Sequence, residues 1–188
     1  MITVRPYLRE AAVTYAARWA KDRNPLFYNF TGIGGDCTNF VSQCVLAGSC
    51  VMNFTPDFGW YYRSVNDRAP AFTGVEYFWD FFTRVPAFLR ANGGIGPFGR
   101  AATREEVTPG DVVQLADAAG DFYHTLLITA VREGELLVSA HSNDVYNRPL
   151  SEYDAPQKRF LRIEGVACAG MIPSCFAGLY TGRRLPFS

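Results

Sequence analysis

The sequence predicts a single α+β domain, with helices in its first half and an antiparallel β-sheet in its second. The chain has 188 residues, of which 48% are hydrophobic and 19% charged. This composition is typical of one compact domain, so we expect residues 1–188 to fold as a unit. The hydrophobic periodicity is helical up to about residue 91 and strand-like from about residue 107. Because a doubly wound sheet would alternate helices with strands, this segregation favours helices packed on one antiparallel sheet.

The helical pattern has identifiable beginnings and ends. Tyr15 and Trp19 lie on the apolar side of the first helix. Asp36 stands at the N-cap position of the second helix, and Gly48 is suited to its end. Pro86 kinks or breaks the third helix, which is followed by a glycine-rich segment. The expected helices cover residues 6–22, 37–48 and 75–91.

The strand pattern begins after these helices. Arg132-Glu133-Gly134 separates two apolar runs and suits the turn of a hairpin. The residues after about 165 carry no pattern that we assign, so residues 166–188 are expected to be an extension of the domain. The expected strands cover residues 111–115, 124–131, 135–141 and 159–165.

Charge and hydropathy exclude several classes of partner. Lys and Arg number 18 and so do Asp and Glu, so the formal net charge is zero. We therefore expect neither nucleic acid nor a membrane surface as a partner. No apolar stretch reaches the length of about 18 residues that spans a bilayer. The first residues lack the apolar core of a signal peptide, which predicts a cytoplasmic protein, or a secreted one if a leader has been removed.

Two patterns that suggest cofactor or metal binding are set aside. Residues 94–99 match G-x-G-x-x-G, but they follow a helix and include Pro97, so we expect a loop. A zinc site built from Cys37, Cys44, Cys50 and a histidine would have cysteine spacings of seven and six residues. These spacings match no common zinc knuckle. We therefore expect no cofactor and no metal.

The five cysteines are an odd number, so at least one thiol stays unpaired within one chain. Cys44 lies on the apolar stripe of the second helix and is expected in the core. The pairing of Cys50, Cys168 and Cys175 stays open.

Cys37 is the candidate nucleophile. It follows the N-cap Asp36, and a helix N-terminus lowers the pKa of a thiol because its free N–H groups and dipole favour negative charge. The N–H of Cys37 itself is free to bind a developing oxyanion. Gly34 and Gly35 would let a substrate approach the backbone closely. The alternative is a buried structural thiol.

A cysteine nucleophile needs a base, and the chain contains two histidines. His124 begins one strand of the expected hairpin and His141 ends the other. Antiparallel pairing brings the start of one strand beside the end of the next, so we expect the two rings to be neighbours at one edge of the sheet.

These residues also carry a resemblance to a known family. It lies in the runs GDCTNFVSQ (35–43), GDVVQL (110–115), YHT (123–125), SAHSND (139–144) and PLS (149–151). Together they resemble the Putative amidase domain family, which is similar to the NlpC/P60-type, papain-like cysteine peptidases and amidases. The resemblance extends from the first helix to about residue 163, and it implies a papain-like fold.

The resemblance implies a role for each matched residue. Cys37 would be the nucleophile and His124 the general base. His141 would occupy the third polar position, with Asn143 and Asp144 as further candidates for orienting His124. Apart from the resemblance, Asp36 at the N-cap is a candidate for orienting these groups or supporting the oxyanion.

The expected reaction is hydrolysis of a peptide-like amide through a thioester, with a cell-wall peptide as one substrate that the resemblance suggests. Acyl transfer to an amine would use the same groups. A binding module that keeps the fold without catalysis is the other alternative. Trp60, Tyr61 and Tyr62 lie in an irregular segment and are candidates for a substrate wall.

Overall fold

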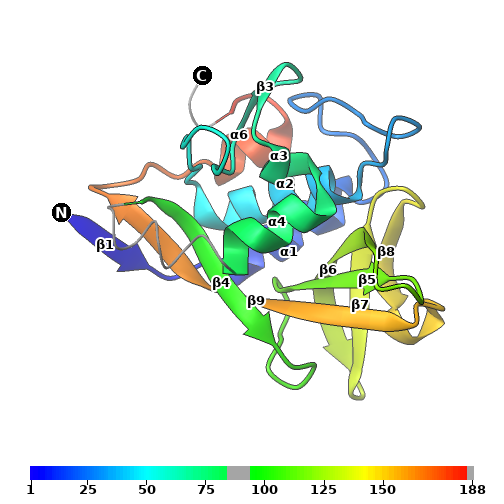
Figure 1. Ribbon diagram of the computed structural model, residues 1–188. Helices are drawn as coiled ribbons and strands as arrows, with labels where there is room; N and C mark the ends of the chain where they lie inside the picture. The colour runs from blue at the N-terminus through cyan, green and yellow to red at the C-terminus, as the bar shows by residue number, and fades with distance from the viewer. Residues whose placement is uncertain (84–93, 186–188) are drawn as a thin grey trace.

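The computed structural model describes residues 1–83 and 94–185. Within these residues the fold is mixed α/β: the helices gather at the centre of the molecule, and strands β5 to β8 lie beside them (Figure 1). The helices are α1 (Arg9–Trp19), α2 (Cys37–Ser49), α3 (Pro70–Thr73), α4 (Val75–Thr83), the 3-10 turn η1 (Leu150–Glu152) and α6 (Phe176–Thr181). The strands are β1 (Ile2–Arg5), β2 (Tyr62–Ser64), β3 (Asp67–Arg68), β4 (Gly96–Ala102), β5 (Val112–Ala116), β6 (Phe122–Arg132), β7 (Glu135–Ala140), β8 (Val145–Pro149) and β9 (Gln157–Ala169).

Every strand pairing among the described residues is antiparallel, as the sequence predicts. The main sheet has the order β1-β9-β5-β6-β7-β8, and β4 also pairs with β9. β6 and β7 form the expected hairpin, in which Leu127 lies opposite Ser139. β9 has 13 residues and pairs with three strands, β1, β4 and β5. It therefore connects β1 and β4 to the strands β5 to β8.

The sheet separates two apolar clusters. One fills the space between the helices and one face of the sheet, where Val112 and Leu127 point. The other lies on the opposite face with Val113 and Leu126, as the alternation of side chains along a strand requires. Every residue of α2 is buried, so the helix that begins with Cys37 is the centre of the first cluster.

The structure corrects several sequence-based expectations. The first helix is shorter than residues 6–22, and the part of the third expected helix beyond Thr83, with Pro86, lies outside the described residues. Residues 94–99 are not simply a loop, because Gly96 begins β4, which pairs with β9. A strand at this place still excludes the dinucleotide motif, which requires a helix to follow the glycines.

Asp111, in the GDVVQL run, connects three segments next to the sheet. Its buried carboxylate accepts hydrogen bonds from the Ile163 and Thr108 N–H groups at 2.8 and 2.9 Å. It also pairs with Arg9 at 2.7 Å. The carboxylate therefore ties α1 to β9 and to the loop before β5, which gives this part of the run a structural role.

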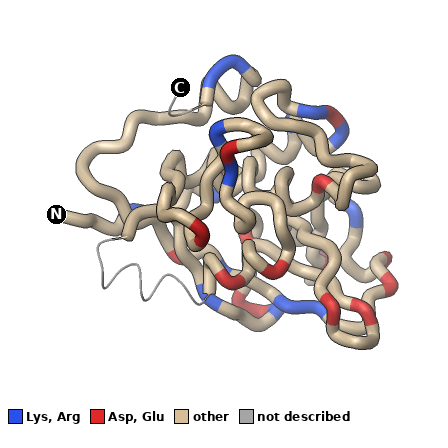
Figure 2. The backbone as a smooth tube through the Cα atoms, turned by 45° about the horizontal axis from the view of Figure 1, so that its top comes forward, with Lys and Arg blue, Asp and Glu red and all other residues tan. Residues whose placement is uncertain are grey.

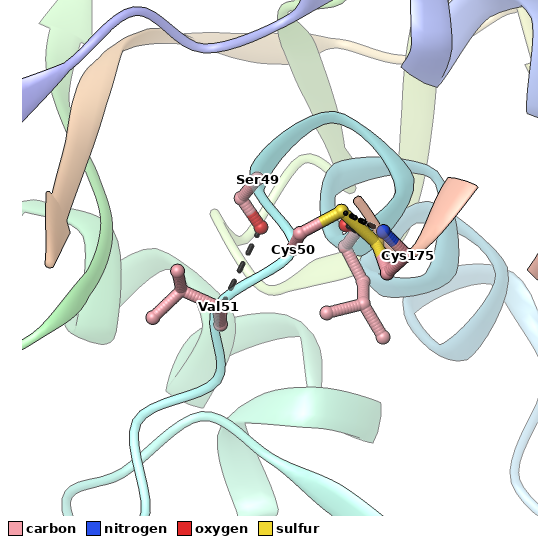
Figure 3. The surroundings of a disulfide bond; sticks show 5 residues. Ser49, Cys50, Val51 and Cys175 are labelled. Carbon is pink, nitrogen blue, oxygen red and sulfur yellow. Dashed lines mark hydrogen bonds between the residues drawn. A yellow bond between two sulfur atoms is a disulfide. The ribbon is translucent and has the colours of Figure 1, made fainter. Parts of the chain in front are cut away.

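Residues 166–185 pack with the rest of the described chain. β9 continues to Ala169 and pairs there with β1, and the chain then returns over the helices to α6. Cys175 forms a disulfide with Cys50 at the end of α2 (Figure 3). Cys37, Cys44 and Cys168 are free thiols, in line with the odd count and with the core position expected for Cys44.

The distribution of charged residues along the backbone and the length of the helices can be compared with the sequence pattern. Basic and acidic segments are interspersed along the chain (Figure 2). Among residues 1–83 and 94–185, no helix has the length and apolar character needed to cross a bilayer.

Candidate active site

Cys37 is the first residue of α2, as predicted, and is 6% exposed. Asp36 occupies the N-cap position, but its side chain makes no capping hydrogen bond to the helix backbone. The first helical bond runs from the Phe40 N–H to the Asp36 carbonyl. The N–H groups of Cys37 and Thr38 therefore have no acceptor within the helix.

The thiol lies among hydrogen-bond donors. The backbone N–H groups of Thr125, Thr38 and Cys37 interact with it, and the Thr38 hydroxyl lies 3.9 Å from its sulfur. Burial raises the pKa of the Cys37 thiol more than these donors lower it. The expectation of a lowered pKa is therefore wrong for this structure: the helix start is buried against the sheet, and desolvation of the thiolate outweighs the donors.

Two threonines connect the start of α2 to the sheet. The Thr38 and Thr125 hydroxyls lie 2.8 Å apart, and both side chains are buried. The Gln114 amide donates to the Thr125 hydroxyl at 3.1 Å and to the Val75 carbonyl at 2.9 Å. These bonds fix the first turn of α2 against β6, directly beside His124.

His124 lies on β6 and is 8% exposed. Because Thr125 points toward α2, the alternation of the strand directs His124 to the other face. Its ring lies 6.2 Å from the Tyr153 ring and 6.4 Å from the Tyr123 ring, centroid to centroid. Within the described part of the chain, the His124 ring has no hydrogen-bond partner and makes no hydrogen bond with Cys37. Burial lowers its pKa from 6.5 to about 4.

His141 lies on the α2 side of the sheet. Its Nδ1 is 2.6 Å from Asp36 Oδ2 and its Nε2 is 2.9 Å from the Trp19 carbonyl. The ring stacks on Phe40 at 4.1 Å between centroids. Both partners are acceptors, so the ring satisfies both when each nitrogen carries a proton.

The two histidines therefore do not form the expected pair. Continuing the β6–β7 register beyond Leu127 and Ser139 places His141 opposite Thr125, one residue away from His124. In a strand, one residue changes the face of the sheet. The structure accordingly brings His141 to Asp36 and leaves His124 on the other side.

Asp36 is the centre of a buried polar group. It is 0% exposed, and its Oδ1 accepts hydrogen bonds from the Phe30 N–H at 3.1 Å and the Asn39 amide at 2.8 Å. Its Oδ2 faces His141 and, at 3.3 Å, the Nε of Arg23. Asp36 thus holds the side chains and the loop around Cys37 in place. Its carboxylate accepts hydrogen bonds and offers no donor to an oxyanion.

The two other candidates for orienting His124 lie elsewhere. Asp144 pairs with Arg23 at 2.8 Å, and Asn143 is exposed in the turn between β7 and β8. Neither makes a hydrogen bond with His124 in the described ranges. Their proximity in the sequence to His141 places them on the Arg23 side of the site.

The expected substrate wall is largely incorrect. Trp60 is 0% exposed, and its Nε1 donates to the Ser42 hydroxyl in the core. Tyr62 is 3% exposed, and its hydroxyl accepts from the Tyr28 N–H. Only Tyr61 is partly exposed, where it packs on Phe54. The backbone here is not irregular, because Trp60 forms a β-bridge with Asn53 and Tyr62 begins β2; the segment packs on the helices and does not line an opening.

Sequence reasoning missed three contributors to the site. Thr38 and Thr125 were signalled by their positions next to Cys37 and His124. Arg23 had no such signal, because it lies 14 residues before Cys37 in a loop without a motif. Among the described residues, no group of three or more His, Cys, Asp and Glu side chains is arranged to hold a metal ion.

Comparison with known proteins identifies the family of the chain that carries this site. The family described as "Putative amidase domain" matches residues 6–163. The chain belongs to this family. A protein of Bacillus subtilis (strain 168), "Uncharacterized protein YhbB", is 32% identical over 155 residues, which are 79% of this chain and 46% of YhbB. The chain thus spans less than half the length of this relative, and no solved structure matches it.

Membership of the amidase family indicates a hydrolase of the amidase type. The matched range includes Cys37, both histidines and Asp36. It ends before Cys168 and Cys175, so the disulfide lies partly outside the range shared with the amidase family.

The buried ring of His124 predicts a pH dependence of stability in this amidase-family domain. The unfolded chain binds a proton at His124 below about pH 6.5, whereas the folded chain binds it only below about pH 4. The free energy of unfolding should therefore fall as the pH is lowered from 6.5 to 4, by up to about 3 kcal/mol from this group. Urea unfolding at a series of pH values measures the fall.

Replacing His124 by glutamine provides the control for this prediction. The variant should lose less stability than the wild-type chain between these pH values, because glutamine does not titrate. Equal losses in the two proteins would show that His124 is not held as a buried neutral ring.

Proposed function

We propose that this domain is a cysteine amidase or peptidase that cleaves a peptide-like amide through a thioester on Cys37. The observation that carries the proposal is the environment of the thiol at the start of α2. Burial raises the pKa of the thiol, while hydrogen bonding from the backbone at Thr125, Thr38 and Cys37 lowers it, and the Thr38 hydroxyl lies 3.9 Å from the sulfur. Such donors stabilise negative charge on the sulfur and on the oxygen of a tetrahedral intermediate.

The proposed reaction begins from a neutral thiol and a neutral imidazole. The raised pKa of Cys37 and the lowered pKa of His124 both favour these forms near pH 7. The sulfur attacks the amide carbon while the thiol proton passes to a nitrogen of His124. The C–N bond then breaks, His124 returns the proton to the leaving amine, and a thioester stays on Cys37. Water, losing a proton to His124, hydrolyses the thioester to a carboxylate and frees the thiol.

His124 is the better candidate for the base of the two histidines. Both nitrogens of His141 are already engaged, by Asp36 and by the Trp19 carbonyl. His124 makes no hydrogen bond within the described ranges, so its nitrogens are free to accept a proton. Because its ring lies on the other face of β6, the proposal requires the start of β6 to turn so that the ring reaches the sulfur. Proton transfer requires an approach to hydrogen-bond distance, which often tightens only when substrate is bound. In this proposal His141 positions Asp36.

The disulfide bears on the substrate class. Disulfides persist mainly in oxidising compartments, so the Cys50–Cys175 bond favours the secreted alternative over a cytoplasmic protein. A cell-wall peptide is a peptide-like amide found in such a place. We therefore propose it as the substrate class, with other peptides as the alternative.

The test uses the whole chain with two probes: purified bacterial cell-wall sacculi and a mixture of casein peptides. Release of free amines measures hydrolysis, and mass spectrometry of the peptide that contains Cys37 detects the acyl-enzyme. We expect amine release from one probe and an acyl adduct on Cys37. Added glycine methyl ester should be incorporated if the thioester is transferred to amines. Absence of both amine release and adduct with both probes would contradict an amidase and favour the binding module.

A further inference from the structure

Arg23 lies next to the candidate nucleophile, yet the proposed reaction does not use it. Its Nε is 3.3 Å from Oδ2 of the buried Asp36, the residue directly before Cys37. A carboxylate at this place opposes a negative charge on the adjacent sulfur. The guanidinium compensates that carboxylate and stays charged at all relevant pH values.

The other side of the guanidinium forms a fork on Asp144. Nη1 and Nη2 of Arg23 donate to its two carboxylate oxygens at 3.1 and 2.8 Å. Nη2 also donates to the Thr31 hydroxyl at 3.0 Å, and Nε to the Asn29 side-chain oxygen at 3.3 Å. Arg23 thus joins the loop before α2 to the turn after β7.

The turn that carries Asp144 is itself bonded to Asp36, the residue before the nucleophile. The Asp36 N–H donates to the Ser142 hydroxyl at 3.2 Å. Ser142 and Asp144 have φ angles of 80° and 46°, in the left-handed region that non-glycine residues seldom adopt. The Asp36 bond to Ser142 and the Arg23 bonds to Asp144 therefore hold the turn in a backbone conformation that costs free energy.

Charged and titratable groups reach the start of α2 from several elements. Asp36 belongs to the helix start, Arg23 to the loop after α1, His124 to β6, and His141 and Asp144 to the end of β7 and its turn. Burial raises the pKa of two phenols, Tyr15 of α1 and Tyr62 of β2, and the charge of Asp36 also acts on them and raises their pKa further. Arg23 is the one permanent positive charge among these seven groups, and it contacts both carboxylates.

We propose that Arg23 is a positioning residue for the nucleophile, which neutralises and orients Asp36 so that a thiolate can form on Cys37. This inference rests on the proposed function in taking Cys37 as the nucleophile. Arg23 acts through Asp36 and touches no reacting atom.

The rate at which iodoacetamide alkylates Cys37, followed by mass spectrometry between about pH 6 and pH 10, tests the inference without a substrate. Cys44 and Cys168 are 0% and 1% exposed, so Cys37 is the most accessible free thiol. In Arg23→Gln we expect the midpoint of the pH profile to rise by about one pH unit, because Asp36 loses its permanently charged partner and keeps only His141 and neutral donors.

Three further variants separate charge from tethering. Arg23→Lys keeps the charge and should retain the wild-type midpoint, even if its melting temperature falls with loss of the fork. Asp144→Asn weakens the fork on Arg23 and also removes a negative charge beside it, but it leaves Arg23 to compensate Asp36, so the midpoint should not rise. Arg63→Gln removes a surface arginine that pairs with Asp67 and serves as the matched control.

An unchanged profile in Arg23→Gln would overturn the inference, as would an equal shift in Asp144→Asn. Should Arg23→Gln fail to fold, the lysine variant decides, since a midpoint raised by about one unit there contradicts the role of charge. The amine-release assay is independent of these profiles. Failure of the proposed amidase activity and failure of the inference about Arg23 are therefore distinguishable.

Discussion

Replacing Cys37 by alanine should lower amide turnover by at least about 10⁴-fold, because no other group on the chain supplies the nucleophile in the proposed reaction. The free energy of unfolding should change by no more than about 1–2 kcal/mol, since a single buried sulfur is lost. Amine release measures the first effect and urea unfolding the second.

Cys44→Ala is the matched control for this prediction. Cys44 is a second free thiol on the same helix and is fully buried in the core. Its loss should reduce stability by a comparable amount and leave turnover near the wild-type value. A Cys37→Ala protein that is strongly destabilised, or that still turns over, would favour a structural thiol at this position.

The elements predicted correctly are those determined by local pattern. α2 begins at Cys37 because Asp36 precedes an apolar helical stripe, and the β6–β7 hairpin forms around Gly134, whose φ is 79°. β4 was missed because Gly96 and Pro97 discourage a strand, and its partner β9 lies more than 50 residues away. Pairing at such a distance leaves no periodic signal in the β4 segment itself.

In the candidate site, too, local sequence predicts some features and tertiary packing determines the others. The placement of Cys37 at a helix start follows from the sequence, whereas the raised pKa of its thiol depends on burial by β6. Both histidines come to the same end of the hairpin, but the register that puts His141 and not His124 toward Asp36 is a tertiary property. The contact of Arg23 with Asp36 depends in the same way on the path of a loop.

Removing the Cys50–Cys175 disulfide should cost about 5 kcal/mol of unfolding free energy, the upper end of the usual range. The bond joins residues 125 apart, so its loss frees a long loop in the unfolded chain. The double variant Cys50→Ala/Cys175→Ala should show this loss in urea unfolding. A reducing agent should lower the wild-type protein to a similar stability and leave the double variant unchanged. Cys168→Ala, which removes a free buried thiol, is the control.

The same bond should also determine whether α6 stays docked. This helix has six residues, too few to be stable alone, and it is held by the Trp19 Nε1 bond to the Tyr180 carbonyl at 3.1 Å and the Asn24 bond to the Leu179 carbonyl at 2.8 Å. We expect the double variant to lose amide hydrogen-exchange protection in α6 while the protection of α2 is retained at the same pH. Because the Trp19 carbonyl also meets His141, undocking of α6 should loosen that ring as well. Unchanged exchange in α6 would show that the disulfide acts on the unfolded chain alone.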